Sequence, residues 1–389
     1  NELYGRIAGE VQEYVLRDMV APEGCFYSAE DADSDGEEGK FYLWTTSEVK
    51  SVLGDNDTEL FCSLYDVNEQ GNFEGKSIPN LIGRGISEAD RLKIEPLRQK
   101  LFAYREKRVH PYKDDKILTS WNGLMIVAMA LGSRVLGDDR YYQAARQAAD
   151  FILKQLRRPD GRLLARYREG ESLYPAYAAD YAFLIWGLIE LYQADFEARY
   201  LQTALELNDD LIKYFWDSEN GGLFINGEDS EQLLARPKED YDGAIPSSNS
   251  VAALNFLRLA RITGNNDLEN MADQQLKAFG TSISEIPAAH SFFMIAALFY
   301  HNRSQEVVIA GKRHESDSRE MLEVINKRFL PGTLVILKDA IDNEDIQEVI
   351  PFVKYMKMVD GRATAYICDN FSCQEPIVDI REFENILTP

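Results

Sequence analysis

Cysteine is scarce in this sequence: four residues among 389, at positions 25, 62, 368 and 373, with no C-x-x-C pair. This number is too small for a disulfide-rich scaffold and predicts a reducing compartment, with a cytoplasmic location as the default. Cys368 and Cys373 lie five residues apart, which is not zinc-ribbon spacing. A redox role for this pair is the less favoured interpretation, because nothing in the sequence activates either thiol.

Long hydrophobic runs are also absent. The longest clean apolar stretch, 292–300, has nine residues, whereas a bilayer-spanning helix needs about 20. No secretory signal opens the chain, so neither a membrane span nor a membrane partner is expected. The sequence starts without Met and inside a helical pattern, which indicates that it is part of a longer protein.

Basic residues are outnumbered, with 42 Lys and Arg against 65 Asp and Glu and a net charge of −23 at pH 7. This balance argues against nucleic acid and anionic lipid as partners, because both need a basic surface. No glycine-rich phosphate loop or nucleophile elbow is present. The four histidines show no metal-ligand spacing, so no metal or cofactor is expected. The hydrophobic content of 45% nevertheless predicts a folded core.

An internal repeat is the most informative feature that is present. Helical patterns at 119–136 and 139–156 are separated by Gly137, which suits a left-handed helix end, and the second pattern carries one apolar stripe. A turn at 159–164 then opens a short hairpin. The same order recurs at 177–216 with a turn at 219–224, at 249–279, and as half a unit at 3–27.

One such unit cannot bury its apolar stripe alone, so neighbouring units must stack with antiparallel helices. Unit spacings of 57 and 71 residues exceed the roughly 33 to 47 of α-solenoids. This favours a closed α/α toroid with β-hairpin loops gathered on one face. We expect one toroid domain over 1–389, lacking its first helix or helices, with units near 1–20, 47–108, 119–157, 177–216, 248–281 and 288–327.

The pattern changes near the C-terminus. Short β-branched runs at 306–310 and 333–337 flank a helix at 316–328, and a third run lies at 365–368. Strand–helix–strand order predicts a small parallel α/β element over 303–370, inserted in the toroid or appended to it.

Five stretches, in chain order, strongly resemble the spermatogenesis-associated protein 20 family, which includes bacterial YyaL-type proteins. They are 28–42 (SAEDADSDGEEGKFY), 114–125 (DDKILTSWNGLM), 180–184 (DYAFL), 236–250 (RPKEDYDGAIPSSNS) and 359–366 (VDGRATAY).

The resemblance implies an all-α dominated fold, an (α/α)6 toroid like those of six-hairpin glycosidases and N-acylglucosamine 2-epimerases. It also implies a thioredoxin-like domain of the same polypeptide as a partner, because family members carry one before the toroid. The histidine signature of the epimerases is not visible in this sequence, which counts against sugar epimerisation. The family has no established activity, so the resemblance indicates fold more strongly than function.

Three carboxylates are candidate catalytic residues: Asp115, Asp180 and Asp242. Asp115 precedes a capped helix, Asp180 lies in an otherwise apolar helical run, and Asp242 precedes the helix that starts near residue 247. Each also has a structural interpretation as a helix cap, a turn residue or a buried ion pair. Glycosidic hydrolysis needs two carboxylates about 5 to 9.5 Å apart, which this set would supply at the toroid mouth.

Candidate substrate contacts accompany these acids, since ligand pockets combine aromatic walls with a few polar groups. Trp121 would stack on a sugar ring and Asn122 would bind hydroxyls. Asp242 and Asn249 hold the same places in their unit as Asp115 and Asn122 do in theirs, and this recurrence is the main local support for a site. The remaining candidates are Glu30, Asp31, His110, Tyr181, Lys238 and Glu239.

The segment that starts at Asp31 has the spacing of a calcium-loop start, with Asp33, Asp35 and Gly36 in register. Position twelve, however, is Tyr42 where a bidentate Glu is required. A solvated acidic turn or an acidic lip at the toroid mouth is therefore favoured over a metal site.

These features predict a carbohydrate-active protein that binds a sugar or polyol and is glycoside hydrolase-like or sugar isomerase/epimerase-like. Isomerisation would need a base with a pKa near 7, and His110 is the only local option. The alternatives are a non-catalytic toroid that binds a ligand or client for the thioredoxin-like domain, and a scaffold with a vestigial cavity.

Overall fold

The computed structural model describes residues 2–231, 234–302, 304–341, 344–369 and 372–387. The chain divides into two compact units, one formed by Asn1–Tyr27 with Lys116–Pro389 and the other by Ser28–Asp115. The assignment of 1–389 to one toroid domain stays a prediction.

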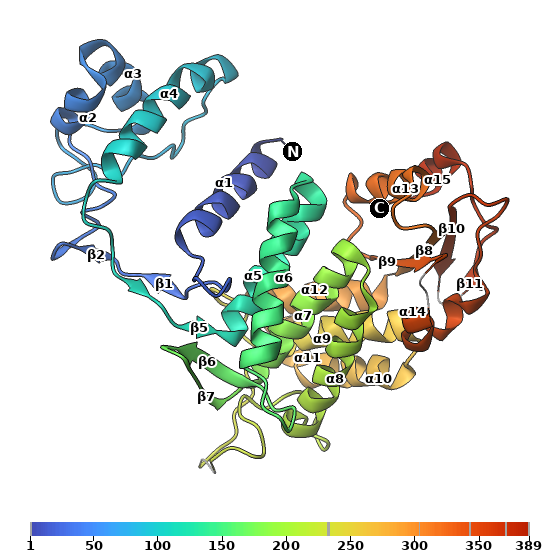
Figure 1. The fold of residues 1–389 in the computed structure, drawn as a ribbon. Coiled ribbons are helices and arrows are strands. Elements are labelled where there is room, and N and C mark those ends of the chain that lie inside the picture. The colour runs from blue at the N-terminus through green and yellow to red at the C-terminus, as the bar shows by residue number, and fades with distance from the viewer. Residues whose placement is uncertain (1, 232–233, 303, 342–343, 370–371, 388–389) are drawn as a thin grey trace. The chain divides into compact units, whose positions relative to one another are not determined.

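The larger unit is built from two layers of helices (Figure 1). Each inner helix packs along the next, in the order α1, α5, α7, α9 and α12, and each outer helix packs on the inner helix before it. The predicted fold class, an α/α toroid dominated by helices, is therefore confirmed. The inner helices are α1 (Glu2–Asp18), α5 (Thr119–Leu136), α7 (Ala178–Asp195), α9 (Ser248–Thr263) and α12 (Ser291–His301), and the outer helices are α6 (Asp139–Gln155), α8 (Ala198–Phe215) and α10 (Asn266–Ala278).

The sequence explains both layers and the turns between them. α7 and α9 are buried almost all round, whereas α6 and α8 bury one stripe. Gly137 and Gly264 end their helices with φ of 73° and 77°, the left-handed region that glycine enters without steric cost. Phe196 fills the equivalent turn with φ of 62°, so the third turn carries the same conformation without a glycine.

Two of the expected helical hairpins are not formed. The 47–108 segment holds three helices that belong to the smaller unit, and α12 is followed by a strand instead of an outer helix. Within the described residues, three complete hairpins remain, α5–α6, α7–α8 and α9–α10, with α1 and α12 as single inner helices. The apolar pattern correctly predicts helices in both segments, but it does not predict which other elements those helices pack against.

A turn follows α1, α6 and α8 in the same way. Each is closed by an antiparallel bridge, Val20 with Phe26, Arg157 with Leu163, and Trp216 with Leu223. After the second turn the chain forms a three-stranded antiparallel sheet in the order β5 (Ile117–Leu118), β6 (Leu164–Arg168) and β7 (Glu171–Pro175). A short helix α11 (Gly280–Glu285) and the 3-10 turn Pro287–Ala289 lead from α10 to α12.

The C-terminal element is a four-stranded sheet in the order β11-β10-β8-β9. β8 and β9 are parallel and joined through α13, whereas β10 runs antiparallel to β8. Cys368 and Cys373 face each other across β10 and β11 and form a disulfide, a pairing that their spacing did not predict. The elements are β8 (Gln305–Gly311), α13 (Ser316–Asn326), β9 (Thr333–Asp339), α14 (Glu344–Val349), the 3-10 turn Pro351–Tyr355, β10 (Thr364–Asp369), β11 (Ser372–Cys373) and α15 (Ile380–Ile386).

The smaller unit packs three helices over its own apolar core, which includes Trp44, Val49 and Ile94. Asp35 and Gly36 form the tip of the β2–β3 hairpin with positive φ, so the calcium-like stretch is a tight acidic turn. The elements are β1 (Ala29–Glu30), β2 (Asp33–Ser34), β3 (Glu37–Glu38), α2 (Thr46–Leu53), α3 (Asp55–Tyr65), α4 (Glu88–Arg105) and β4 (Lys113–Asp114).

Candidate functional site

Asp180 links the starts of two inner helices. Its carboxylate accepts the backbone N–H of Ser120 at 2.8 Å, in the first turn of α5, and that of Tyr177 at 2.7 Å, at the N-cap of α7. Burial raises the pKa of Asp180 to about 6, although the hydrogen bonds from Tyr177 and Ser120 oppose the shift. A carboxyl group that titrates near neutrality suits proton transfer, and its two backbone bonds give it a structural role as well.

Asp242 does the same for the next pair of helices. One carboxylate oxygen accepts the Ser247 N–H at 2.9 Å and the Ser250 hydroxyl at 2.6 Å, at the start of α9. The other accepts the N–H groups of Phe292 at 2.7 Å and Phe293 at 3.2 Å, at the start of α12. Four donors hold this carboxylate, so it satisfies orphan N–H groups of both helices.

The recurrence of Asn122 and Asn249 is a repeated backbone clamp. Asn122 accepts the N–H of Phe26 at 2.8 Å and donates to its carbonyl at 3.0 Å. Asn249 does the same to Leu223, at 2.6 and 3.0 Å. The Tyr181 hydroxyl accepts the N–H of Leu163 at 3.0 Å, in the turn after α6. α5, α7 and α9 thus each bind one of the three turns, and these three side chains are buried in that role.

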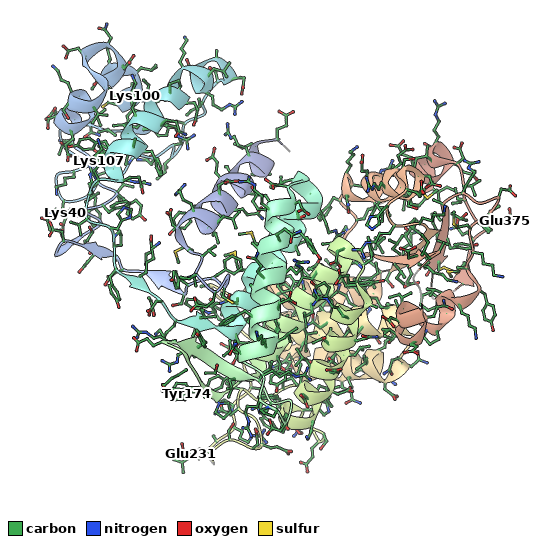
Figure 2. All side chains as sticks on the ribbon, viewed as in Figure 1. Lys40, Lys100, Lys107, Tyr174, Glu231 and Glu375 are labelled. Atoms are coloured by element: carbon green, nitrogen blue, oxygen red, sulfur yellow. A yellow bond between two sulfur atoms is a disulfide. The ribbon has the colours of Figure 1, made fainter. Side chains whose placement is uncertain are left out.

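Other predicted contacts lie at the surface of the same loop face. Trp121, in the first turn of α5, is 43% exposed, and Tyr174 on β7 extends outward (Figure 2). Lys238 pairs with Asp217 at 2.7 Å, which lowers the pKa of Asp217 well below its usual range. Glu239 is exposed, and its carbonyl accepts the Asn249 amide at 2.8 Å.

The remaining predicted residues lie in the smaller unit. Glu30 accepts the Tyr42 hydroxyl at 3.1 Å and pairs with Lys113 at 3.3 Å. Asp31 accepts the Asp33 N–H at 3.1 Å. His110 is exposed, with its ring 4.6 Å from that of Phe41. The half-buried Asp115 ends this unit, directly after β4.

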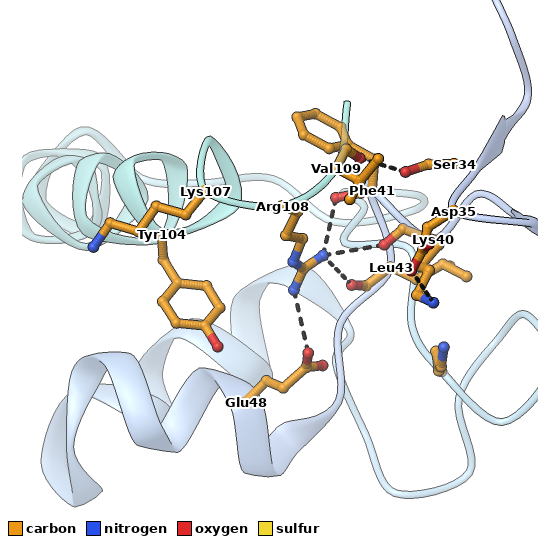
Figure 3. A pocket seen from close by; sticks show the side chains of 11 residues that line it. Ser34, Asp35, Lys40, Phe41, Leu43, Glu48, Tyr104, Lys107, Arg108 and Val109 are labelled. Atoms are coloured by element: carbon orange, nitrogen blue, oxygen red, sulfur yellow. Dashed lines mark hydrogen bonds and ion pairs between the residues drawn. The ribbon is translucent and has the colours of Figure 1, made fainter. Parts of the chain in front are cut away.

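The smaller unit also has a cavity of its own, of about 350 Å³. The Arg108 guanidinium donates to the carbonyls of Phe41 at 2.9 Å and Leu43 at 2.7 Å (Figure 3). It also lies 4.2 Å from the centre of the Trp44 ring. These contacts use Arg108 to hold the loop before α2, so this cavity has a structural explanation.

Another cavity, of about 290 Å³, lies on the inner helices of the larger unit. Its walls come from α5, α7, α9 and α12, and the segment from α13 to β9 borders it. Aromatic rings form much of the wall, with Trp186 and Phe292 in edge-to-face contact at 4.9 Å. Ligand sites in helical proteins typically have this combination of apolar walls and few polar groups.

One carboxylate is buried in this cavity. Glu190 accepts Nη1 of Arg258 at 2.6 Å, Nη1 of Arg134 at 3.3 Å and the indole N–H of Trp186 at 3.2 Å. Burial raises the pKa of Glu190, but the two guanidinium groups outweigh it and the net pKa is lowered. Glu190 is therefore ionised near neutrality, and it suits accepting hydrogen bonds or a proton better than donating one.

Sequence reasoning missed this cluster, although a signal was present. Glu190 interrupts the same apolar run of α7 that drew attention to Asp180, and Arg258 interrupts the buried pattern of α9. A charge on a buried helix face needs a partner, and that argument applies equally to both. What the sequence does not show is that α5, α7 and α9 bring Arg134, Glu190 and Arg258 together.

Within the described residues, no helix is both long and apolar enough to cross a membrane. No known protein-family profile matches the chain. Solved structures are similar to this chain only at a low level. A GH76 α-mannanase from Bacteroides thetaiotaomicron has a TM-score of 0.38 and 14% identity over 50% of this chain and 62% of that one. A D-mannose isomerase has a TM-score of 0.38 and 13% identity over 72% and 85%. Similarity at this level carries no conclusion about activity.

Curated proteins match far more closely. Spermatogenesis-associated protein 20 from Homo sapiens is 32% identical over 100% of this chain and 55% of its own length, and the Rattus norvegicus protein is 31% identical over the same shares. The chain thus spans about half the length of these relatives. The resemblance carried by the five motifs is confirmed: along its whole length, this chain is similar to spermatogenesis-associated protein 20 and corresponds to part of that protein.

Proposed function

We propose that this chain is a carbohydrate-active protein, glycoside hydrolase-like or sugar isomerase-like, that binds its sugar or polyol in the cavity on the inner helices. The observation that carries the proposal is the Trp186–Glu190 pair within an aromatic wall. An aromatic ring offers a stacking face to the C–H side of a sugar, and an ionised carboxylate accepts hydrogen bonds from hydroxyl groups. Chemistry at the cavity would use Glu190 as a base.

A second candidate function is ligand binding without turnover, in the service of a thioredoxin-like domain of the same polypeptide. This candidate is favoured because the buried carboxylates already accept several hydrogen bonds from the protein itself. Glu190 has three donors and Asp242 has four, so neither offers an unoccupied pair of oxygens to a reacting bond. Binding needs no such pair, whereas hydrolysis of a glycoside needs an acid as well as a base.

The test is a binding and turnover screen with mono- and disaccharides. We expect at least one sugar to raise the melting temperature and to quench tryptophan fluorescence. Trp186→Phe gives the sugar a smaller stacking face and removes the N–H bond that helps to hold Glu190, so it should weaken binding of that sugar about tenfold. Trp121→Phe is the matched control at the loop face and should leave the affinity unchanged.

The outcomes separate the alternatives. Sugar turnover that Glu190→Gln abolishes while binding persists would support the enzyme, and binding without turnover in the unaltered protein would support the second candidate. If Trp121→Phe weakens sugar binding and Trp186→Phe does not, the binding site is at the loop face, near Asp180, and not in this cavity. No response to any sugar would overturn the proposal.

A further inference from the structure

The parallel strands β8 and β9 have their carboxyl ends side by side, and the packing of the helical layers assigns no role to this end of the sheet. Gly311 and Asp339, the last residues of the two strands, are in register. The chain leaves β8 through the 312–315 loop and enters α13, so this edge is the carboxyl end of a strand–helix–strand unit. In open α/β sheets, ligands bind outside the carboxyl ends of parallel strands.

A cavity of about 520 Å³ lies at this place. Arg313 and His314 line it from the loop, Arg319 from α13 and Arg146 from α6, and the turn between α7 and α8 completes it. Three arginines from the 312–315 loop, α13 and α6 therefore line one cavity, in a chain whose net charge is −23.

These arginines differ from their neighbours in their partners. Arg199, near the start of α8, pairs with Glu197 at 2.7 Å and Asp150 at 2.8 Å. Within the described residues, Arg146, Arg313 and Arg319 form no ion pair within 4.0 Å, and Nε of Arg146 is buried without a hydrogen-bond partner. A buried donor without a partner is costly unless a ligand or water meets it.

The acidic groups that line the same cavity are already engaged. Asp195 accepts the Tyr142 hydroxyl and the Glu197 N–H, the latter at 2.8 Å. Asp139 accepts the Gln143 amide at 3.1 Å, and Glu197 is held by Arg199. Burial raises the pKa of Asp195 and the charge of Arg313 opposes that rise, but the two residues form no ion pair within 4.0 Å. The arginines therefore keep donors for a ligand, and guanidinium matches oxyanions with two parallel hydrogen bonds.

We propose that this cavity binds the phosphate group of a small phosphorylated molecule, with Arg313, Arg319 and Arg146 as its ligands. The site is separate from the cavity that holds Glu190, so the proposal does not depend on the carbohydrate function.

The test is isothermal titration of the full chain with inorganic phosphate and, in parallel, with glucose 6-phosphate. Both should bind, because both present the same oxyanion. Tighter binding of the ester would identify a phosphorylated metabolite as the ligand, and equal affinities would identify the free anion. Arg313→Ala and Arg319→Ala should each weaken binding about tenfold, the loss of one charge-assisted hydrogen bond.

Arg381→Ala is the matched control, because Arg381 is an exposed arginine of α15 outside this cavity. The Arg381→Ala variant should bind phosphate and glucose 6-phosphate as tightly as the unaltered protein does. Arg319 is exposed and Arg313 is half-buried, so both variants should fold, which circular dichroism would verify. The proposal is overturned if neither probe binds at about 10 mM, or if Arg381→Ala weakens binding as much as the cavity variants do.

Discussion

At the scale of single residues, the loop face is held together by polar side chains that each serve two elements. Asp180 and Asp242 bridge the starts of neighbouring inner helices, and Asn122 and Asn249 bind the turn before their helix. The sequence predicted that Asn122 and Asn249 recur at equivalent places, and the structure explains that recurrence by hydrogen bonding to backbone. It had paired Asp242 with Asp115, whereas the structure gives the matching bridge to Asp180. Their predicted part in chemistry stays a prediction.

Asp180 should make folding stability depend on pH. Its folded pKa of about 6 exceeds the ordinary 3.8, so between these values the folded state holds a proton that the unfolded state has lost. Stability should therefore fall as pH rises from about 4 to about 6, by up to about 3 kcal/mol. Asp180→Asn should remove this loss, as urea unfolding at several pH values would show.

Asp360→Asn is the control for this series. Asp360 is exposed with φ of 51°, a conformation that asparagine tolerates. Its pH profile should follow that of the unaltered protein. A profile of Asp180→Asn that also matched the unaltered protein would contradict the role assigned to burial.

At the scale of elements, the contact between α5 and α7 is unusually close. A Cβ atom on Gly123 would lie 2.6 Å from the backbone carbonyl carbon of Phe183, and one on Gly187 would lie 3.0 Å from Ile126. The helices approach this closely because both positions lack a side chain. Their spacing therefore depends on two glycines inside helices, where glycine otherwise costs about 1 kcal/mol.

Gly123→Ala should force α5 and α7 apart and destabilise the protein by about 3 kcal/mol. Chemical denaturation would measure this. Gly280→Ala is the control, because no atom outside its immediate surroundings lies within 4 Å of the added Cβ. If the two variants unfold at the same denaturant concentration, the close approach does not limit stability.

The elements also show how far a sequence can be interpreted. Gly137, Gly264 and the apolar stripe of α6 locate helix ends and outer faces, because these depend on neighbours along the chain. The bonds from Arg134 and Arg258 to Glu190 join three helices and could not be predicted, because they depend on how those helices pack. The prediction of two further helical hairpins was wrong for the same reason, because a helical pattern does not show which element a helix packs against.

At the scale of the whole molecule, the charge of −23 opposes compactness through self-repulsion. Added salt screens that repulsion, and the Debye length falls from about 30 Å at 0.01 M to about 8 Å at 0.15 M. The melting temperature at pH 7 should therefore rise by about 2 °C over this range, a gain of order 1 kcal/mol. Scanning calorimetry would measure it.

The effect should shrink near pH 4.7, where the net charge vanishes. An uncharged osmolyte at the same concentration is the control and should give no such dependence on pH. A melting temperature that falls with salt at pH 7 would mean that favourable ion pairs outweigh the net repulsion.

The tyrosine clamp has a practical consequence for protein engineering. Tyr181 grips Leu163 at 3.0 Å, and the carbonyl of Leu163 receives the N–H of Ala176 at 2.9 Å, so the base of the β6–β7 ribbon is pinned. Its tip, Glu169 and Gly170, has positive φ and is solvent-exposed. Because the base of the hairpin is fixed, epitopes or reporter peptides inserted at that tip should not disturb the packing of the helices.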